Sequence, residues 1–423
     1  MEWIIAERDR YEGAGMLREF MQERMLAVDS EAAKPFSEDM IRAVDIAPSA
    51  WLPRIAIYDP SRTASVATSD RTGKVVVSRY GSRIIVHESG GYFWKPDEIR
   101  ADVFACAERH HVAEVAIEKN SLDEFLLQPI RYEMLRRGVA LQLRPLQAPQ
   151  DRDKEAFIMG LQAFFKAGDI LLVGGRGMHA QLVAEILNFP GGRLDILNAL
   201  AYALRVFSGE PVYQDFGEAN IAPAAEPRLG ERVFACWNAS ASETVCVALT
   251  KEGRSISVAA DWAKSGPITD AVKDIAASLR ARFPGALVQA YLPAELHDQW
   301  TRIALAPALR EARLTPWRGE AMAVARGALA EPMRTVFKTR RALSVDARAT
   351  LTLAALAGGY KYPIGRSGAP GAEPEAGLSR LVAEAIEVAV AWLARGFDES
   401  STEGHYATNP QGFRFRSALP QRR

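Results

Sequence analysis

The sequence is poor in cysteine and has no excess of charge of either sign. Its 423 residues include only Cys106, Cys236 and Cys246, with no C-x-x-C spacing. This argues against a disulfide framework and a structural zinc site, and it is typical of a reducing compartment. The 52 basic and 52 acidic residues give a formal net charge of zero. Overall charge therefore does not indicate a nucleic-acid-binding protein, although a local basic face suffices to hold phosphates.

Long apolar runs are absent as well. No stretch approaches the roughly 18 apolar residues that a membrane span needs, and the first residues lack the basic-then-apolar layout of a signal peptide. No Ser-His-Asp or Cys-His order and no dinucleotide fingerprint after a strand occur, which argues against acyl transfer and hydride transfer. We therefore expect a globular cytoplasmic protein without a membrane partner, built from two or three domains.

Hydrophobic patterning divides the chain into two α/β domains. We expect a helical extension or linker over 1–50, a first domain over 51–207, a linker over 208–230, a second α/β domain over 231–400 and a basic flexible tail over 401–423. The first domain has the predicted order β-β-β-α-β-α-β-α-β-α-α, with a turn at Arg71-Thr72-Gly73. That order favours a mixed sheet with helices on both faces. A similar order in the second domain predicts an internal repeat, with an unrelated α/β domain as the alternative.

Three acidic residues adjoin apolar elements of the first domain. Asp59 ends the first strand, Glu118 ends a later strand, and Asp195 opens the last helix. A buried acid is costly unless it is compensated, and oxygen ligands suit Mg²⁺ or Mn²⁺. Two such ions about 3.5–4 Å apart can hold the attacking and leaving oxygens of a phosphodiester in line. Acids at strand ends are common, however, and Asp195 is also explained as a helix-start residue that the helix dipole favours.

An ordered series of short motifs resembles the nuclease part of phage terminase large subunits. The series comprises residues 17–23, Tyr58-Asp59-Pro60-Ser61, Ile117-Glu118-Lys119-Asn120, Lys154 with Gly168-Asp169-Ile170, and Leu182 through Phe189-Pro190 to residues 195–203. The resemblance covers about half of the chain. The ordered series is far more specific than any one of its pieces.

The resemblance implies an RNase H-like fold over 51–207, with two Mg²⁺ or Mn²⁺ ions bound by Asp59, Glu118 and Asp195. It implies cleavage of concatemeric double-stranded DNA during genome packaging, in the host cytoplasm. A packaging ATPase, a small terminase and a portal are the partners that it implies. Four further residues are candidates for supporting the ligands or contacting DNA phosphates, namely Lys154, Asn198, Asn120 and Arg131.

The chain departs from the family pattern in two ways. The family signature usually has an acid just before Asp195 and another three residues after it, where this chain has Leu194 and Asn198. Because Asn198 forms hydrogen bonds but carries no charge, we expect lower metal affinity or activity. The phosphate loop G-x-x-x-x-G-K-[ST] is also missing, since Gly174-Gly175-Arg176-Gly177 lacks the following Lys and Ser or Thr. The chain is therefore expected to be a nuclease-only fragment or a split gene product.

The second domain is predicted to lack the metal site. Laid over the first domain, it places Asn238 opposite Asp59, Tyr291 opposite Glu118 and Asp346 opposite Asp195, which favours a scaffold or docking role. For the whole chain we expect a metal-dependent endonuclease with low sequence preference. Two alternatives stay open: a catalytically silent packaging-motor subunit that binds DNA and partners, and a Holliday-junction resolvase of the same fold.

Overall fold

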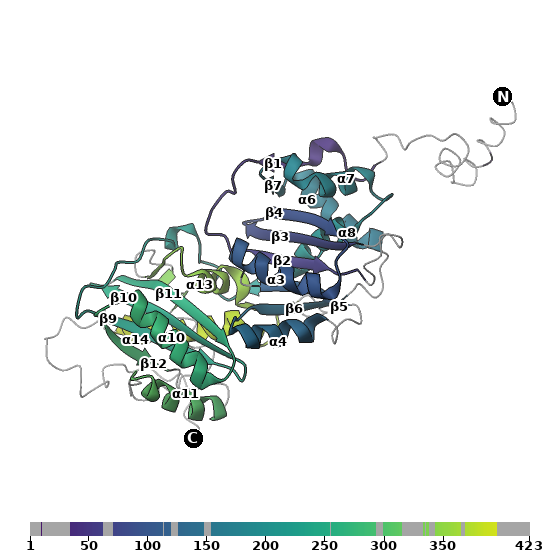
Figure 1. Cartoon of the computed structure of the whole chain (residues 1–423). Helices are drawn as coiled ribbons and strands as arrows, with labels where there is room; N and C mark the ends of the chain where they lie inside the picture. The colour runs from purple at the N-terminus through teal and green to yellow at the C-terminus, as the bar shows by residue number, and fades with distance from the viewer. Residues whose placement is uncertain are drawn as a thin grey trace, which may run out of the picture.

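Two α/β units make up the computed structural model, one around a seven-stranded sheet and one around a five-stranded sheet (Figure 1). The structure describes residue 10 and residues 34–61, 71–112, 114–119, 126–147, 154–253, 255–292, 299–314, 333–334, 336–337, 343–364 and 369–395. The motif at 17–23 and the predicted tail lie outside these ranges. None of the helices within them is both long enough and apolar enough to cross a membrane.

The first sheet is mixed and has the strand order β1-β7-β4-β3-β2-β5-β6. Its strands are β1 (Arg42–Val44), β2 (Ile55–Asp59), β3 (Thr72–Tyr80), β4 (Arg83–Tyr92), β5 (Glu114–Lys119), β6 (Gln142–Gln147) and β7 (Ile170–Val173). Strands β2, β3 and β4 form an antiparallel meander, while β5 runs parallel to β2 and β6 parallel to β5. If β2 is numbered 1, strands β2 to β6 lie side by side in the order 3-2-1-4-5. Only strand 2, which is β3, runs antiparallel to the other four. This is the RNase H-like arrangement that the resemblance implied.

Helices cover both faces of this sheet because side chains alternate along its strands. Ala56, Tyr58 and Val76 pack with α3 (Pro96–His110) and α4 (Gln128–Arg137). Ile57 and Val75 point the other way and pack with a second group of helices. That group consists of α5 (Lys154–Ile158), α6 (Gln162–Ala167), α7 (Ala180–Asn188), α8 (Asp195–Ala201) and α9 (Ala203–Val206). Asp59 follows Ile57 by two residues in β2, so its side chain points to the same face of the sheet, the face that α8 covers.

The first domain begins before residue 51, within the segment expected to be an extension. Strand β1 pairs in parallel with β7 at the edge of the sheet. Phe36 is fully buried and packs edge-on against Phe165 and Phe189, with ring centroids 5.3 Å apart in both pairs. The sequence pattern gave no sign of β1, because this strand is only three residues long and has no buried side chain.

The second sheet repeats the topology of the first. Its order is β12 (Leu287–Tyr291), β9 (Arg232–Ala239), β10 (Glu243–Glu252), β11 (Ser255–Ser265) and β13 (Leu343–Val345). Pairing directions match those of β5-β2-β3-β4-β7 strand for strand. The register shifts at the corresponding step in each sheet, between Val76 and Val77 in β3 and between Ala248 and Leu249 in β10. The predicted internal repeat is therefore confirmed. Its helices are α10 (Ile268–Arg282), α11 (Gln299–Glu311), α13 (Thr350–Ala354) and α14 (Leu378–Arg395).

The shared register shift shows which residues of the two sheets correspond. Ala56 pairs with Val76, and Ala235 pairs with Ala248. Three residues further along each strand, Asn238 is the counterpart of Asp59, as predicted.

The other two predicted counterparts are wrong. Tyr291 pairs with Cys236, so the counterpart of Glu118 falls two residues later, at position 293 outside the described ranges. Helix α14 packs on β9 and β10 as α8 packs on β2 and β3. Asn238 contacts Leu381 of α14 as Asp59 contacts Asn198 of α8. Since each contact lies three residues after the start of its helix, Leu378, and not Asp346, takes the place of Asp195. The number of residues between the last strand of the sheet and the covering helix differs between the two domains. Sequence spacing therefore predicted the wrong counterpart for Asp195.

The segment between the domains is packed rather than loose. Strand β8 (Glu210–Pro211) pairs with β14 (Lys361–Tyr362). Val212 and Tyr213, which follow β8, are buried in the core of the second domain. Residues 210–213 of the predicted linker are thus packed with the second unit.

Candidate active site

Three elements bring Asp59, Glu118 and Asp195 to one end of the first sheet. Asp59 is the last residue of β2, Glu118 lies in the neighbouring parallel strand β5, and Asp195 is the first residue of α8. Their exposed fractions are 7%, 5% and 8%. The structure therefore buries all three carboxylates that the sequence analysis singled out.

Asp59 and Glu118 form a buried pair of like charge. Burial raises the pKa of Asp59 well above its usual range, and the neighbouring Glu118 carboxylate raises it further. The Oε2 atom of Glu118 is buried without a hydrogen-bond partner. A buried carboxylate oxygen without a partner is costly, and these oxygen donors fit a divalent cation.

Two of the predicted supporting residues contact the carboxylates. Lys154 Nζ lies 3.8 Å from Asp59 Oδ2 and 3.6 Å from Asp195 Oδ1. Asn198 Nδ2 donates a hydrogen bond to Asp59 Oδ2 at 2.8 Å. Both contacts lower the pKa of Asp59, against the effect of burial and Glu118. The Lys154 side chain is 44% exposed, so its ammonium group stands at the solvent side of the carboxylates.

Of the other two predicted supporting residues, only Arg131 is among the described residues, and it lies away from the carboxylates. Asn120 lies outside the described residues. Arg131 is exposed on α4 and lines a groove between the domains, together with Glu243 and Glu375. Arg131 was predicted to contact DNA phosphates because its helix follows the strand of Glu118. This part of α4 faces the second domain instead.

The carboxylates are not gathered around one point. Within the described ranges, no group of three or more acidic, histidine or cysteine side chains is arranged to hold a metal ion. Asp195 is instead directed to Lys154 and to the backbone of Arg71, whose N–H donates to Asp195 Oδ2 at 3.4 Å. An ion shared by all three carboxylates would require Asp195 to exchange these partners for the ion.

A buried ion pair under the start of α8 was not predicted. Glu185 of α7 accepts a hydrogen bond from the Leu197 N–H at 2.9 Å and from Arg71 Nη2 at 2.6 Å. Burial raises the pKa of Glu185 to about 7. Because α8 has no side-chain cap of its own, Glu185 satisfies one of the free N–H groups at its first turn. The one sequence signal was an acid between Leu182 and Ile186 on the apolar face of α7.

Gly73 allows α8 to lie directly on β3. Gly73 was predicted in a turn, but it lies in β3 and pairs with Asp59. A Cβ atom at this position would overlap the carbonyl oxygen of Asp195. Glycine inside a strand often marks such a close approach of another backbone segment.

The corresponding place in the second domain has a different use. Asn238 Nδ2 donates to the carbonyl oxygen of Leu381 at 3.1 Å, and Leu378 stands where Asp195 does. The start of α14 contacts β6 of the first domain instead, because the Ser379 N–H donates to Gln142 Oε1 at 3.1 Å. Just before α14, Glu375 forms an ion pair with Arg144 of β6 at 2.9 Å. At the positions of Asp59 and Asp195 the second domain thus has no carboxylate, and it uses this end for docking.

Comparisons with known proteins add likenesses of fold. No family model and no curated protein matches the chain. It is similar to the human cytomegalovirus terminase nuclease domain, with a TM-score of 0.32 and 14% identity over 40% of this chain and 91% of that chain. It is also similar to the nuclease domain of the large terminase subunit gp2 of bacterial virus Sf6, with a TM-score of 0.29 and 15% identity over 36% and 87% of the two chains. For the large terminase of a thermophilic bacteriophage in complex with ATP-gamma-S, the TM-score is 0.32, with 12% identity over 66% and 70%. All three TM-scores and identities are low, so these likenesses carry no conclusion about function.

Proposed function

We propose that the chain is a Mg²⁺- or Mn²⁺-dependent endonuclease that cuts double-stranded DNA. The observation that carries this proposal is the buried pair of Asp59 and Glu118, which has an unpaired oxygen and is linked to a third buried carboxylate, Asp195, through Lys154. A protein core does not keep such a pair for stability, because removing the like charges would relieve their repulsion. Strained electrostatics of this kind are typical of a catalytic site.

The residues have separate roles in this proposal. Two divalent ions, when bound, supply an activated water and stabilise the charge that develops on the phosphate. Asp59, Glu118 and Asp195 would hold the ions, and Asn198 would orient Asp59 through its hydrogen bond. Lys154, released from Asp59 and Asp195, would be free to pair with a DNA phosphate. Because these groups address the backbone and not the bases, sequence preference would be low.

Genome packaging is the process in which we place this activity. The motif series from Tyr58 to Tyr202 supports it, as does the RNase H-like sheet. A packaging ATPase, a small terminase and a portal would then be the partners of this chain.

A catalytically silent DNA- or partner-binding subunit of a packaging motor is the second candidate. Lys154 favours it, because its ammonium group already partly neutralises Asp59 and Asp195. Asn198 favours it as well, since an uncharged side chain stands where the family signature has an acid.

Cleavage of supercoiled plasmid with Mn²⁺ or Mg²⁺ tests the proposal. We expect nicking and linearisation by the wild type, loss of both in Asp59→Asn, and retention in Asp274→Asn, the same chemical change at an exposed acid of α10. Absence of cleavage with either metal, together with intact DNA binding, would establish the silent subunit. Preferential cleavage of four-way junctions over linear duplexes would instead identify a resolvase.

A further inference from the structure

The helix that carries Asp195 continues to the boundary between the domains. Helices α8 and α9 form one rod through Tyr202, whose N–H donates to the carbonyl of Asn198 and whose carbonyl accepts from the Val206 N–H at 2.9 Å. The segment from Asp195 to Val206 is about 18 Å long at the rise of an α-helix. All residues from 195 to 203 are buried, so the rod cannot shift sideways without disturbing close-packed neighbours.

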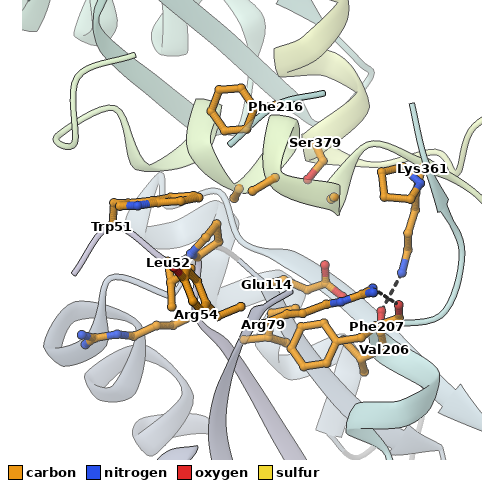
Figure 2. A pocket seen from close by; sticks show the side chains of 18 of the residues that line it. Trp51, Leu52, Arg54, Arg79, Glu114, Val206, Phe207, Phe216, Lys361 and Ser379 are labelled. Carbon is orange, nitrogen blue, oxygen red and sulfur yellow. Dashed lines mark hydrogen bonds between the residues drawn. The ribbon is translucent and has the colours of Figure 1, made fainter. Parts of the chain in front are cut away.

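A lysine of the second domain caps the far end of this rod. Lys361 Nζ in β14 donates to the carbonyl oxygens of Val206 at 2.6 Å and Ser208 at 2.5 Å. Figure 2 shows this side chain reaching toward Val206 and Phe207, beside a cavity of about 480 Å³ between the domains. The last carbonyl groups of a helix lack partners within the helix, and a cation at this end is favoured by the helix dipole.

Burial of the Lys361 ammonium group is energetically unfavourable. Lys361 is only 4% exposed, and burial, with the positive charge of Arg144, lowers its pKa to about 8. Glu375 and Glu114 oppose this effect, while Arg79 adds to it. Burial of an ammonium group is unfavourable unless its hydrogen bonds are satisfied. The carbonyl oxygens of Val206, at the end of α9, and of Ser208 accept hydrogen bonds from the ammonium group. Docking of the second domain and capping of α9 by Lys361 therefore depend on each other.

We propose that Lys361 is a positioning residue through which the second domain sets the place of Asp195 and Asn198 in the nuclease site. Glu185 holds the start of the rod and Lys361 holds its end, so both ends are fixed by charged side chains from outside the helix. Loss of the second contact frees the rod to move along its axis, which shifts Asn198 relative to Asp59 and Asp195 relative to Lys154. This inference rests on the proposed function, and it makes metal binding dependent on the docked second domain.

The test compares Lys361→Met with Lys361→Arg and with a matched interface variant, Glu375→Gln. Glu375→Gln removes the ion pair with Arg144 across the same boundary but touches neither α8 nor α9. We expect the half-saturating Mn²⁺ concentration for plasmid cleavage to rise about tenfold in Lys361→Met, with an unchanged KM for DNA. Lys361→Arg should restore much of the affinity, and Glu375→Gln should shift it far less than Lys361→Met, because the lysine keeps its hydrogen bonds to Val206 and Ser208. A purely structural role would lower the active fraction, and hence kcat, without shifting the metal dependence.

Two readouts separate this inference from the proposed nuclease activity. Hydrogen exchange of the amides from 195 to 208 should accelerate in Lys361→Met and not in Glu375→Gln, whether or not DNA is cut. Mn²⁺ affinity measured by electron paramagnetic resonance should weaken in the same variant. Exchange and affinity equal to the wild type would overturn the positioning role, whereas altered exchange in a protein that never cleaves DNA would overturn only the nuclease. If Lys361→Met does not fold, Lys361→Gln, which keeps an amide donor, gives the same comparison.

Discussion

The backbone of Gly73 lies directly against the carbonyl group of Asp195, so closely that a methyl group on Gly73 would overlap the carbonyl oxygen. Gly73 also pairs with Asp59 in the sheet. One residue without a side chain thus sets the distance between the strand that ends in one carboxylate and the helix that begins with another.

Gly73→Ala should therefore push the start of α8 away from β3. We expect a loss of about 1–3 kcal/mol in the free energy of unfolding and weaker Mn²⁺ binding, measured by denaturant titration and calorimetry. Gly177→Ala is the control, because a Cβ there meets no atom within 4 Å. Equal stability and metal affinity in the two variants would show that α8 does not depend on the glycine.

Asp59→Asn should stabilise the metal-free protein while removing its response to metal. The substitution relieves repulsion with Glu118, the effect that, with burial, raises the pKa of Asp59. A gain of about 1 kcal/mol would raise the melting temperature in EDTA by about 2–4 °C. Added Mn²⁺ should raise the melting temperature of the wild type but not that of the variant. A melting temperature that falls in EDTA would mean that the carboxylate contributes to folding.

Asn198→Asp should have the opposite effect. It adds a fourth carboxylate to the site, at hydrogen-bonding distance from Asp59, where Asn198 now donates at 2.8 Å. We expect a lower melting temperature in EDTA and Mn²⁺ binding tighter by about tenfold, determined by titration calorimetry. Asn188→Asp, at the exposed end of α7, adds the same charge outside the site and should change neither quantity. Unchanged metal affinity in Asn198→Asp would show that this position lies outside the ion-binding region.

Glu387→Gln should flatten the dependence of stability on pH. Burial raises the pKa of Glu387 in α14 to about 7, against a usual value of about 4.5. Between these values the folded state keeps a proton that the unfolded state has released, so stability falls as pH rises from about 4.5 to about 7. The contribution is at most about 3 kcal/mol. Thermal unfolding of both proteins across this range should show a wild-type loss that the variant lacks. Parallel curves would contradict the prediction.

The order of elements and the carboxylates could be predicted because the signals are local. Asp59, Glu118 and Asp195 each adjoin a short apolar run, and the motif series placed Lys154 and Asn198 beside them. Gly73 was misplaced because a glycine after Arg71 and Thr72 has the composition of a turn. Only the approach of α8, more than 100 residues later, explains why it lies in a strand.

The contacts that hold α8 in place could not be predicted, since they join distant parts of the chain. Arg71 meets Glu185 across 114 positions, and Lys361 meets Val206 across 155. In sequence these residues are an ordinary arginine, an acid in a helix and a lysine before a proline-containing loop. The counterparts of Glu118 and Asp195 in the second domain were misjudged for a related reason, because only strand register and helix packing define them.

The register shift shared by the two sheets determines which side chains of each sheet face its core. An extra residue in a strand reverses the facing of every side chain beyond it, so such a feature is difficult to gain or lose once a core has formed around it. The extra residue lies at the same step in both sheets, His87 of β4 opposite Val76 and Val77, and Ala259 of β11 opposite Ala248 and Leu249. In the second domain, the corresponding end has Asn238 in place of Asp59 and contacts the first domain through Ser379 and Glu375.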